Sequence, residues 1–453
     1  MEKALPSHVE EFVNQENYKE IVADMLNIAQ QSGATQSEVG ISASVGLHVT
    51  TRMQEVETLE FNRDKSVGIT VFIDNKKGSA STTDISKESV RATVQAAIDL
   101  AKFTEPDPFA GLAEEFDMAR DYTSLNLDLY HPWDISVDEA IRIAKTCEET
   151  AFAVDKKIIN SEGATISSSQ GYHVYGNSHG FVGNYPTSRH SLSCTVIAQD
   201  AQGMERDYQY TVSRQHHLLE SAQKIGKDAA DRALRRLSAK KLPTQRVAVL
   251  YHATIAAGLI SHFISAISGG RLFRRSSFLM DSLNKKIFPE HIHIYERPHL
   301  KGALGSAPYD SDGVTTKDKD FVLDGIIQNY VLSAYSARKL NMQNTGNAGG
   351  VHNLFIKPGE DNLDALIKKM GRGLIVTELM GQGINLVTGD YSRGATGFWV
   401  ENGEIQYPVH EITIAGNLKN MFEKLIAVGN DVERRGTIQT GSLLIEEMTL
   451  AGV

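Results

Sequence analysis

Residues 251–263, YHATIAAGLISHF, contain two histidines, His252 and His262. Imidazole is the commonest metal ligand in proteins, and a helix with histidines on one face is typical of zinc peptidases. His262 has no second histidine four residues away in either direction, which favours a polar residue within a packed helix. The stretch therefore predicts a helix and raises the question of whether that helix carries a metal site.

A second pair of histidines, His291 and His293, alternates in HIHIYERPH. On a strand, alternate side chains point to the same face, so the pair could bind one metal ion. Further ligands would have to come from Glu296 or His299, which are more distant. A solvated or partly buried strand face is the interpretation that we favour.

The segment YDSDGVTTKD has a faint likeness to a calcium-binding loop, through Asp310, Asp312 and Gly313. An EF-hand loop also needs a glutamate at its twelfth position, and this segment has none. We therefore predict a hairpin turn here instead of a calcium site.

Asparagine and glycine are concentrated in NTGNAGGVHN, residues 344–353. Glycine lets the backbone come close to a ligand or to another strand. We take Asn347, Gly349 and Gly350 as a candidate peptide-binding loop, and an ordinary connection remains the alternative. The glycine-punctuated run 376–394 also offers a strand edge to which an extended peptide could add.

Several other classes of protein are excluded or disfavoured. The 453 residues contain no GxxxxGK[ST] phosphate loop and no GxSxG nucleophile elbow. The net charge of -10 argues against nucleic-acid binding, although Arg232, Arg235 and Arg236 form a local basic cluster. The two cysteines, Cys147 and Cys194, predict reduced core residues of a cytosolic protein.

Residues 247–270 contain no Asp, Glu, Lys or Arg and so imitate a membrane span. The strand-like RVAVLY and the histidines and hydroxyls that follow favour a buried strand and then a buried helix, with no membrane partner. The N-terminal MEKALPSHVEEFVN is acidic and has no apolar signal region, so we expect a cytoplasmic protein.

A weak repeat with an offset of 125 residues runs through the first half of the chain. Each copy begins with a helical pattern, continues with alternating strands and closes with a second helix. The matched pairs are VGLHV (45–49) with QGYHV (170–174), GITVF (68–72) with SCTVI (193–197), and Gly78 with Gly203, each glycine ending a turn.

The second half is rich in hairpin signals. Asp324-Gly325 and Asn402-Gly403 each separate two apolar runs, which is the signature of a two-residue turn. Helices are predicted within 361–371 and 417–429. We expect an α+β protein whose second half is mainly an antiparallel sheet or barrel with helices. The predicted units are an α+β unit at 1–110, a linker at 111–135, a related α+β unit at 136–240 and a β-rich, peptidase-like domain at 241–453.

Several long motifs together resemble the TldD/PmbA family of metallopeptidase-related proteins, most closely its PmbA branch, also called TldE. The resemblance covers nearly the whole chain and includes the order of the units. The motifs are MERDYQY, SARKL with TGNAGG, VTELMGQG, TGDYSRGATGFWVENGEIQYPV and EITIAGNLKNM.

The resemblance implies a cytoplasmic two-protein peptidase, made of TldD and TldE, that degrades unfolded or flexible peptides and trims leader segments from modified peptide precursors. In the TldD branch, it implies zinc held by an HExxxH helix and by a cysteine near the C-terminus. The peptide would lie as an extended strand in a cavity between domains.

The same comparison implies that this chain has lost the zinc ligands. Anchored on Gly258-Leu259, the HExxxH motif places His252 at the first histidine, Ala253 at the glutamate and Ala257 at the second histidine. The C-terminal cysteine position falls near Thr440. Catalytic zinc usually needs three protein ligands and a nearby carboxylate base, so we expect no metal bound by this chain.

Our leading expectation is therefore a PmbA/TldE-type subunit that is catalytically incomplete and needs a TldD-like partner, which would hold the zinc. Whether the chain alone is an enzyme stays open. One alternative is an autonomous peptidase that uses another centre, such as the strand with His291 and His293. The other is a non-enzymatic peptide-binding protein that works as a homodimer.

Overall fold

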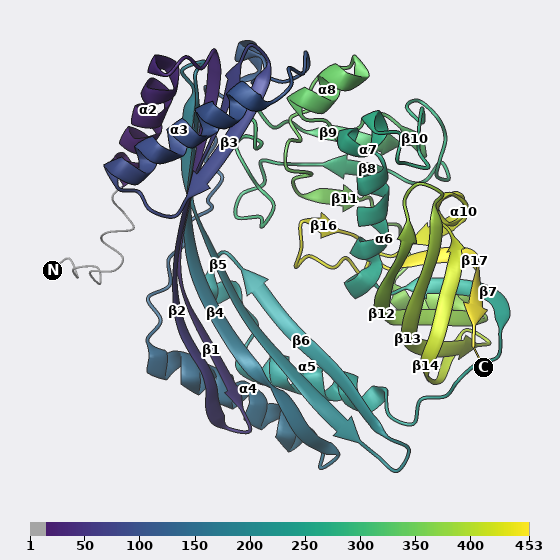
Figure 1. The fold of residues 1–453 in the computed structure, drawn as a ribbon. Helices are drawn as coiled ribbons and strands as arrows, with labels where there is room; N and C mark the ends of the chain where they lie inside the picture. Colours follow the sequence, from purple (N-terminus) through teal and green to yellow (C-terminus); the bar gives the residue numbers. More distant parts are fainter. Residues whose placement is uncertain (1–14, 453) are drawn as a thin grey trace.

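The computed structural model describes residues 15–452. Its N-terminal half is one long, twisted, antiparallel sheet of six strands in the order β3-β2-β1-β4-β5-β6 (Figure 1). The strands are β1 (Gln36–Arg52), β2 (Glu55–Ile73), β3 (Lys76–Thr82), β4 (Ile158–Asn177), β5 (Val182–Gln199) and β6 (Met204–Ser213).

The predicted repeat corresponds to the two halves of this continuous sheet. β1 pairs with β4 in a register that places Val45 opposite Gln170. These two residues are 125 residues apart, which is the offset of the repeat. Equivalent residues face each other only where a local twofold axis crosses two antiparallel strands, so the axis passes between Val45 and Gln170.

Four helices cover one face of the long sheet. They are α2 (Gln15–Gln31), α3 (Lys87–Phe103), α4 (Val137–Val154) and α5 (Ala222–Arg235). Three of them begin at a serine whose hydroxyl accepts a hydrogen bond from a first-turn N–H, namely Ser86, Ser136 and Ser221. On each strand, apolar residues at every second position pack beneath these helices. The residues between them therefore face away from the helices, toward the C-terminal half.

The C-terminal half is built on a closed five-stranded barrel. Its strands pair in the order β14-β13-β12-β7-β17, and pairing of β14 with β17 closes the ring. The strands are β7 (Gln245–Tyr251), β12 (Gly373–Asn385), β13 (Asp390–Glu401), β14 (Glu404–Asn417) and β17 (Leu443–Ala451). Only β7 and β12 run parallel within it. β15 (Leu425–Val428) extends the sheet from β17.

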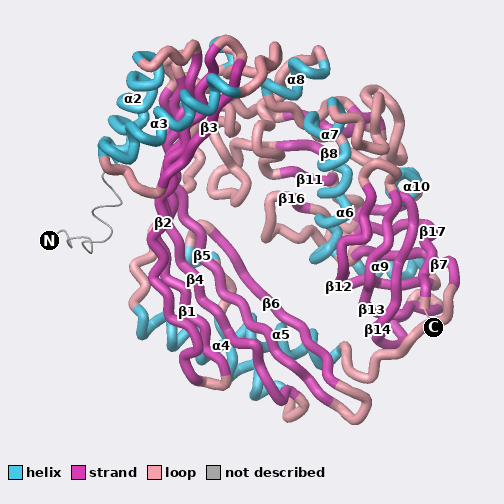
Figure 2. The backbone as a smooth tube through the Cα atoms, in the orientation of Figure 1, coloured by secondary structure: helices cyan, strands magenta, loops and turns pink. Residues whose placement is uncertain are grey.

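A smaller sheet and several short helices complete this half (Figure 2). The sheet has the order β10-β9-β8-β11-β16, from β8 (Ile294–Glu296), β9 (Lys319–Leu323), β10 (Ile326–Ile327), β11 (Leu354–Ile356) and β16 (Ile438–Gln439). The helices are α6 (Ala253–Ala266), α7 (Gly269–Phe273), α8 (Ala334–Leu340), α9 (Leu363–Met370) and α10 (Leu418–Glu423). One large apolar core joins the barrel, α6 and the small sheet.

The mixed α+β class and both hairpins are confirmed. Asn402 and Gly403 connect β13 to β14 with φ of 55° and 74°, and Asp324 and Gly325 connect β9 to β10 with φ of 51° and 76°. These are the positive values that a two-residue hairpin turn requires. The uncharged run 247–270 is the strand β7 followed by α6, and no helix among residues 15–452 is long and apolar enough to cross a membrane.

Two local predictions are wrong. The helix expected over 417–429 ends at Glu423, because its last residues form the strand β15 against β17. Gly78 does not end a turn, since the turn lies at Asp74 and Asn75 and Gly78 is inside β3. A Cβ at Gly78 would lie 2.0 Å from the Ala97 carbonyl oxygen, so glycine here allows α3 to approach the sheet.

Candidate functional site

His252 lies at the N-terminal end of α6, one residue before the helix begins. Its φ and ψ are -60° and 145°, which is extended backbone, and its N–H donates to the Val376 carbonyl at 3.0 Å. Its Nδ1 accepts from the Thr254 N–H at 3.3 Å and lies 2.8 Å from the Thr254 hydroxyl. The helix predicted from Tyr251 thus starts at Ala253, because Tyr251 belongs to β7 and His252 is the helix cap.

The hydrogen bond at Nδ1 also assigns the protonation state of this imidazole. Because Nδ1 accepts from a backbone N–H, the single proton of the neutral ring is on Nε2. Burial lowers the pKa of His252 below its ordinary value of 6.5, although the Asp431 carboxylate acts in the opposite direction. The ring is therefore neutral at pH 7.

The segment containing Thr440 packs against this same helix start. The Ala253 N–H donates to the Ser442 hydroxyl at 3.0 Å, and that hydroxyl donates to Asp431 Oδ2 at 2.6 Å. Thr440 is fully buried, and its hydroxyl donates to the Gly441 carbonyl at 3.0 Å. Ala257 is half-buried, one turn further along α6. The structure thus brings the four zinc-motif positions into one region of the fold.

These residues do not fit a catalytic zinc ion. Among the four motif positions only His252 has a side chain that ligates zinc, and its Nδ1 is already hydrogen-bonded. The neighbouring Asp431 carboxylate accepts both the N–H and the hydroxyl of Ser442. Across residues 15–452, no group of three or more His, Cys, Asp or Glu side chains is arranged to hold a metal ion.

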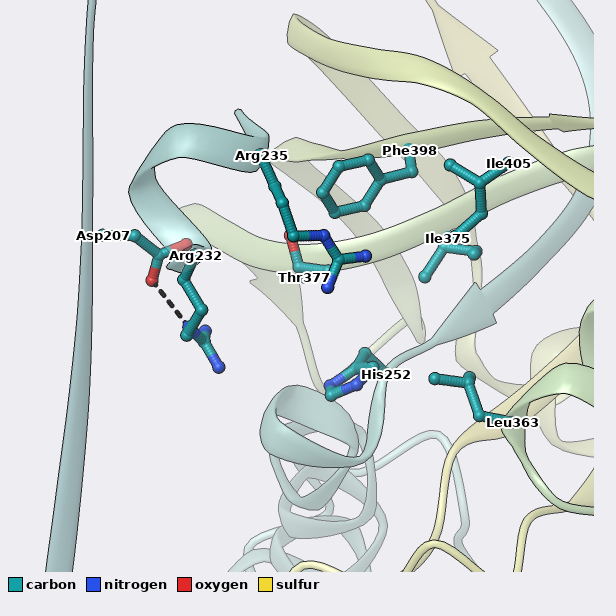
Figure 3. A pocket seen from close by; sticks show the side chains of 9 residues that line it. All are labelled: Asp207, Arg232, Arg235, His252, Leu363, Ile375, Thr377, Phe398 and Ile405. Carbon is teal, nitrogen blue, oxygen red and sulfur yellow. Dashed lines mark hydrogen bonds and ion pairs between the residues drawn. The ribbon is translucent and has the colours of Figure 1, made fainter. Parts of the chain in front are cut away.

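A small cavity of about 90 Å³ adjoins His252 (Figure 3). Arg235 lies above the Phe398 ring, with its guanidinium carbon 5.1 Å from the ring centre. Arg232 Nε lies 3.1 Å from Asp207 Oδ1. The cavity is lined by Asp207, Arg232, Arg235, His252, Leu363, Ile375, Thr377, Phe398 and Ile405, so it lies between α5, the start of α6 and the barrel strands.

The third arginine of the basic cluster, Arg236, joins the two halves of the molecule. Its Nη2 lies 2.6 Å from Glu378 on β12 and 3.1 Å from the Thr396 hydroxyl. Its other contacts are Glu205 and Asp207 on β6, each at 3.4 Å. The cluster predicted from the sequence is thus partly neutralised by carboxylates, and it fixes the end of α5 against the barrel.

The asparagine- and glycine-rich loop is organised around Glu296, which is fully buried at the end of β8. Asn347 Nδ2 donates to both Glu296 oxygens at 3.1 Å, and Lys319 Nζ lies 3.1 Å from one of them. The His352 N–H donates to the same carboxylate. Gly349 and Gly350 have φ of 93° and 119°, so glycine is required by the backbone at both positions.

Part of this loop faces a cleft of about 660 Å³ between the long sheet and the C-terminal half. Gly349 and His352 line it on the loop side. On the other side, the lining residues come from β1, β2, β4 and β5. Of the three residues singled out in the loop, Gly349 lies at the cleft and Asn347 anchors the loop from behind.

The segment with Asp310 and Asp312 forms a turn, as predicted. Asp310 Oδ1 accepts from the Asp312 and Val314 N–H groups, and its Oδ2 accepts from the Ala348 N–H at 2.8 Å. Asp312 Oδ2 accepts from the Ala334 N–H. These carboxylates bind backbone N–H groups, so their local role is to shape the turn and to tie it to the asparagine- and glycine-rich loop.

The histidine pair does not form one strand face. β8 begins only at Ile294, and His291 is an exposed residue of the preceding turn. His293 Nε2 lies 2.9 Å from Asp320 Oδ1 on β9. The expected strand does not include His291 or His293, because the chain turns at His291 and β8 starts only at Ile294.

Several residues of this region carry no recognisable sequence motif. Ser442 and Asp431 reach the start of α6 from near the C-terminus, and Lys319 reaches Glu296 from another strand. Local signals exist for Arg232, Arg235 and Arg236, which lie close together along the chain, for His252 and for the asparagine- and glycine-rich loop.

Three protein-family profiles match the chain. They are the PmbA/TldA metallopeptidase domain 1 over residues 37–101, the central domain over 130–237 and the C-terminal domain over 244–452. The Escherichia coli O157:H7 protein named Metalloprotease PmbA is 49% identical over 435 residues, which cover 96% of each chain. A Haemophilus influenzae homolog of PmbA is 47% identical over 439 residues, or 97% of each chain.

Solved structures have the same fold. A Bacteroides thetaiotaomicron protein described as a proposed modulator of DNA gyrase matches with a TM-score of 0.91 and 26% identity, covering 96% of this chain and 99% of that chain. TldE from Thermococcus kodakarensis matches with a TM-score of 0.80 and 19% identity, covering 95% and 100%. The second likeness concerns the fold alone.

Proposed function

Because this chain belongs to the PmbA/TldD metallopeptidase family, we propose that it is a PmbA/TldE-type subunit of a two-protein peptidase. In this proposal a TldD-like partner supplies the zinc and the cleavage step, and this chain shapes the chamber that receives the peptide. The substrates are unfolded or flexible peptides, including leader segments of peptide precursors. The assembly acts in the cytoplasm, which agrees with two buried, unpaired cysteines.

The observation that carries the proposal is the chemistry at the start of α6. A zinc peptidase needs three ligands and a base at this place. Here His252 caps the helix, and alanine occupies positions 253 and 257. Thr440 is buried with its hydroxyl bound to the Gly441 carbonyl. These residues support a role for the region as a scaffold.

The cleft supports the peptide-handling part of the proposal. Its volume of about 660 Å³ is within the range of ligand-binding clefts. Serine and threonine side chains, several charged side chains and the asparagine- and glycine-rich loop border it. Such a surface offers hydrogen bonds to an extended backbone without selecting large apolar side chains.

The test mixes the purified chain with a TldD-type protein that carries HExxxH. Complex mass, zinc content and cleavage of an unstructured peptide are then measured together. We expect a complex of both chains with zinc contributed by the partner alone, and cleavage that exceeds that of the partner by itself. One zinc per chain in the isolated protein, together with chelator-sensitive cleavage, would overturn the proposal.

The same experiment decides between the alternatives. If the isolated chain cleaves peptides, H291A/H293A tests whether these two histidines carry the activity. If it never associates with a TldD-type protein and only self-dimers are recovered from the native host, the protein is a separate peptide-binding homodimer. Either result would replace the two-protein proposal.

A further inference from the structure

Arg214, directly after β6, is a buried cation with no carboxylate partner in the described part of the chain. Arg214 is only 7% exposed. Nε donates to the Ala303 carbonyl at 3.0 Å, Nη2 to the Leu304 carbonyl at 2.9 Å and Nη1 to the Ser188 carbonyl at 3.3 Å. Among residues 15–452, no Asp or Glu oxygen lies within ion-pair distance of this guanidinium.

A second arginine lies beside it. In the ladder between β5 and β6, His190 is opposite Ser213, so the next residues outward on the two strands are Arg189 and Arg214. Arg189 is exposed and likewise forms no ion pair with a described residue. Burial, together with a smaller effect of the positive charge of Arg189, lowers the pKa of Arg214 to about 10. Two cations thus lie next to each other, and none of the described residues places a carboxylate between them.

Both arginines line the cleft described above. The register of the sheet shows what lies next to them on the same face. Ser44 on β1 is opposite Gly171 on β4, which is opposite Thr187 on β5. On the next rung toward the arginines, Gly46 is opposite Ser169, which is opposite Arg189. The side chains on the floor of the cleft are therefore short, and several carry hydroxyl groups. The two arginines lie along one side of this floor.

The acids near this floor do not reach the arginines. Asp64 lines the cleft from β2, where it is opposite Ser44, and β1 and β4 separate it from β5. Glu296 lies behind the loop and is already bound by Lys319 and Asn347. A buried charge without a counter-charge is unfavourable, so such groups are normally paired. An anion that enters the cleft would supply the missing charge.

We propose that Arg189 and Arg214 form a subsite for a carboxylate of a peptide that lies in this cleft. The inference rests on the proposed peptide-handling function and adds a substrate preference for acidic peptides. Three of the five guanidinium N–H groups of Arg214 bind carbonyl oxygens, which leaves two for a ligand. Arg189 lies on the open side of the cleft and contacts the carboxylate from there, so that the carboxylate lies between the two cations. The carboxylate is either an Asp or Glu side chain or the C-terminus of the peptide.

Fluorescence anisotropy on the isolated full-length chain tests the subsite. The probes are labelled, unstructured, glycine- and serine-rich peptides in three forms. The first has a central glutamate and an amidated C-terminus, the second replaces that glutamate by glutamine, and the third keeps the glutamine and has a free C-terminal carboxylate. We expect the first or the third peptide to bind about tenfold more tightly than the second, which corresponds to about 1.4 kcal/mol.

Three variants show where the preference arises. R189Q removes an exposed charge and should reduce the preference to near unity. R214K keeps a positive charge but loses the fork of donors, so it should weaken the same preference. The matched control is R142Q on α4, on the helix-covered side of the sheet, where the side chain is 70% exposed. If R214K does not fold, R189Q and R142Q decide the question.

Equal affinities of the three peptides for the wild-type chain would overturn the subsite, as would a preference that survives R189Q or an isolated chain that binds none of them. The peptidolysis assay with the TldD-type partner reports separately on the proposed function. Cleavage of neutral peptides without an acidic preference would remove only the subsite. An acidic preference in a chain that never supports cleavage would remove only the peptidase role.

Discussion

The carboxylate of Glu378 on β12 lies 2.6 Å from Nη2 of Arg236 at the end of α5. Arg236 is 11% exposed at its side chain and also contacts Glu205 and Asp207 on β6. One guanidinium thus links the long sheet to the barrel. It also neutralises carboxylates that come from both halves of the molecule.

R236Q should therefore lower the free energy of unfolding by about 3–5 kcal/mol, because breaking a buried pair leaves Glu378 with no other charged partner among residues 15–452. Urea denaturation of the full chain measures this. The control R142Q removes an exposed arginine and should change stability by less than about 0.5 kcal/mol. Equal stability of the two variants would show that this ion pair does not join the halves.

Glu296 gives a prediction about pH. Burial alone would raise the pKa of Glu296, but the hydrogen bond from His352 and the charge of Lys319 outweigh burial, and the net pKa is below its ordinary value of 4.5. A lowered pKa means that the folded protein binds the proton more weakly than the unfolded chain does. The stability contributed by Glu296 is therefore fully present above pH 4.5 and is lost as the pH falls below it.

The variant E296Q should remove that part of the pH dependence. Unfolding free energies measured across this range should fall more steeply with decreasing pH for the wild type than for E296Q. E360Q, at an exposed acid of the same half, should keep the wild-type slope. A slope that is unchanged in E296Q would contradict the role of Glu296 as an ionised anchor of the asparagine- and glycine-rich loop.

His252 gives a prediction about helix capping. H252A should lower the free energy of unfolding by about 1 kcal/mol, because the Thr254 N–H loses its acceptor. H252N should recover most of this loss, since asparagine is a good N-cap residue. Thermal or urea denaturation compares the three proteins. If H252N were as unstable as H252A, the hydrogen bond at the cap would not explain the presence of histidine here.

The turn between β13 and β14 gives a prediction about backbone conformation. Gly403 has a φ of 74°, and a Cβ there would lie 3.1 Å from Lys368 Cα. G403A should cost about 1 kcal/mol or more of unfolding free energy, because alanine strains this conformation. G436A is the matched control, since its Cβ would have no neighbour closer than 3.6 Å. A similar effect of both changes would argue against strain at the turn.

Local chemistry decided which features the sequence could predict. Asn402-Gly403 and Asp324-Gly325 predict hairpin turns because few residues tolerate two successive positive φ values. The apolar spacing of residues 87–103 suits the helix α3, and Ser86 caps the start of that helix. The segment 425–428 follows a helical pattern but forms a strand, because its conformation is decided by pairing with β17, which lies outside the segment.

The pair of arginines in the cleft could not be foreseen for the same reason. Arg189 and Arg214 belong to different segments and meet only through the register of β5 with β6. Ser442 reaches Ala253 from the other end of the C-terminal half. The start of α6 shows an intermediate case, in which the motif residues were identified but the exact first residue of the helix was not.

The pairing of Val45 with Gln170 also constrains how the chain is made. Val45 of β1 is synthesised 125 residues before Gln170, the residue of β4 that it will face. Until β4 is made, β1 is paired with β2 on one side and has an open edge on the other. An open strand edge is a template for wrong pairing with other chains. Synthesis of β4 closes that edge along its whole length, and a chain truncated before β4 would be left with it permanently exposed.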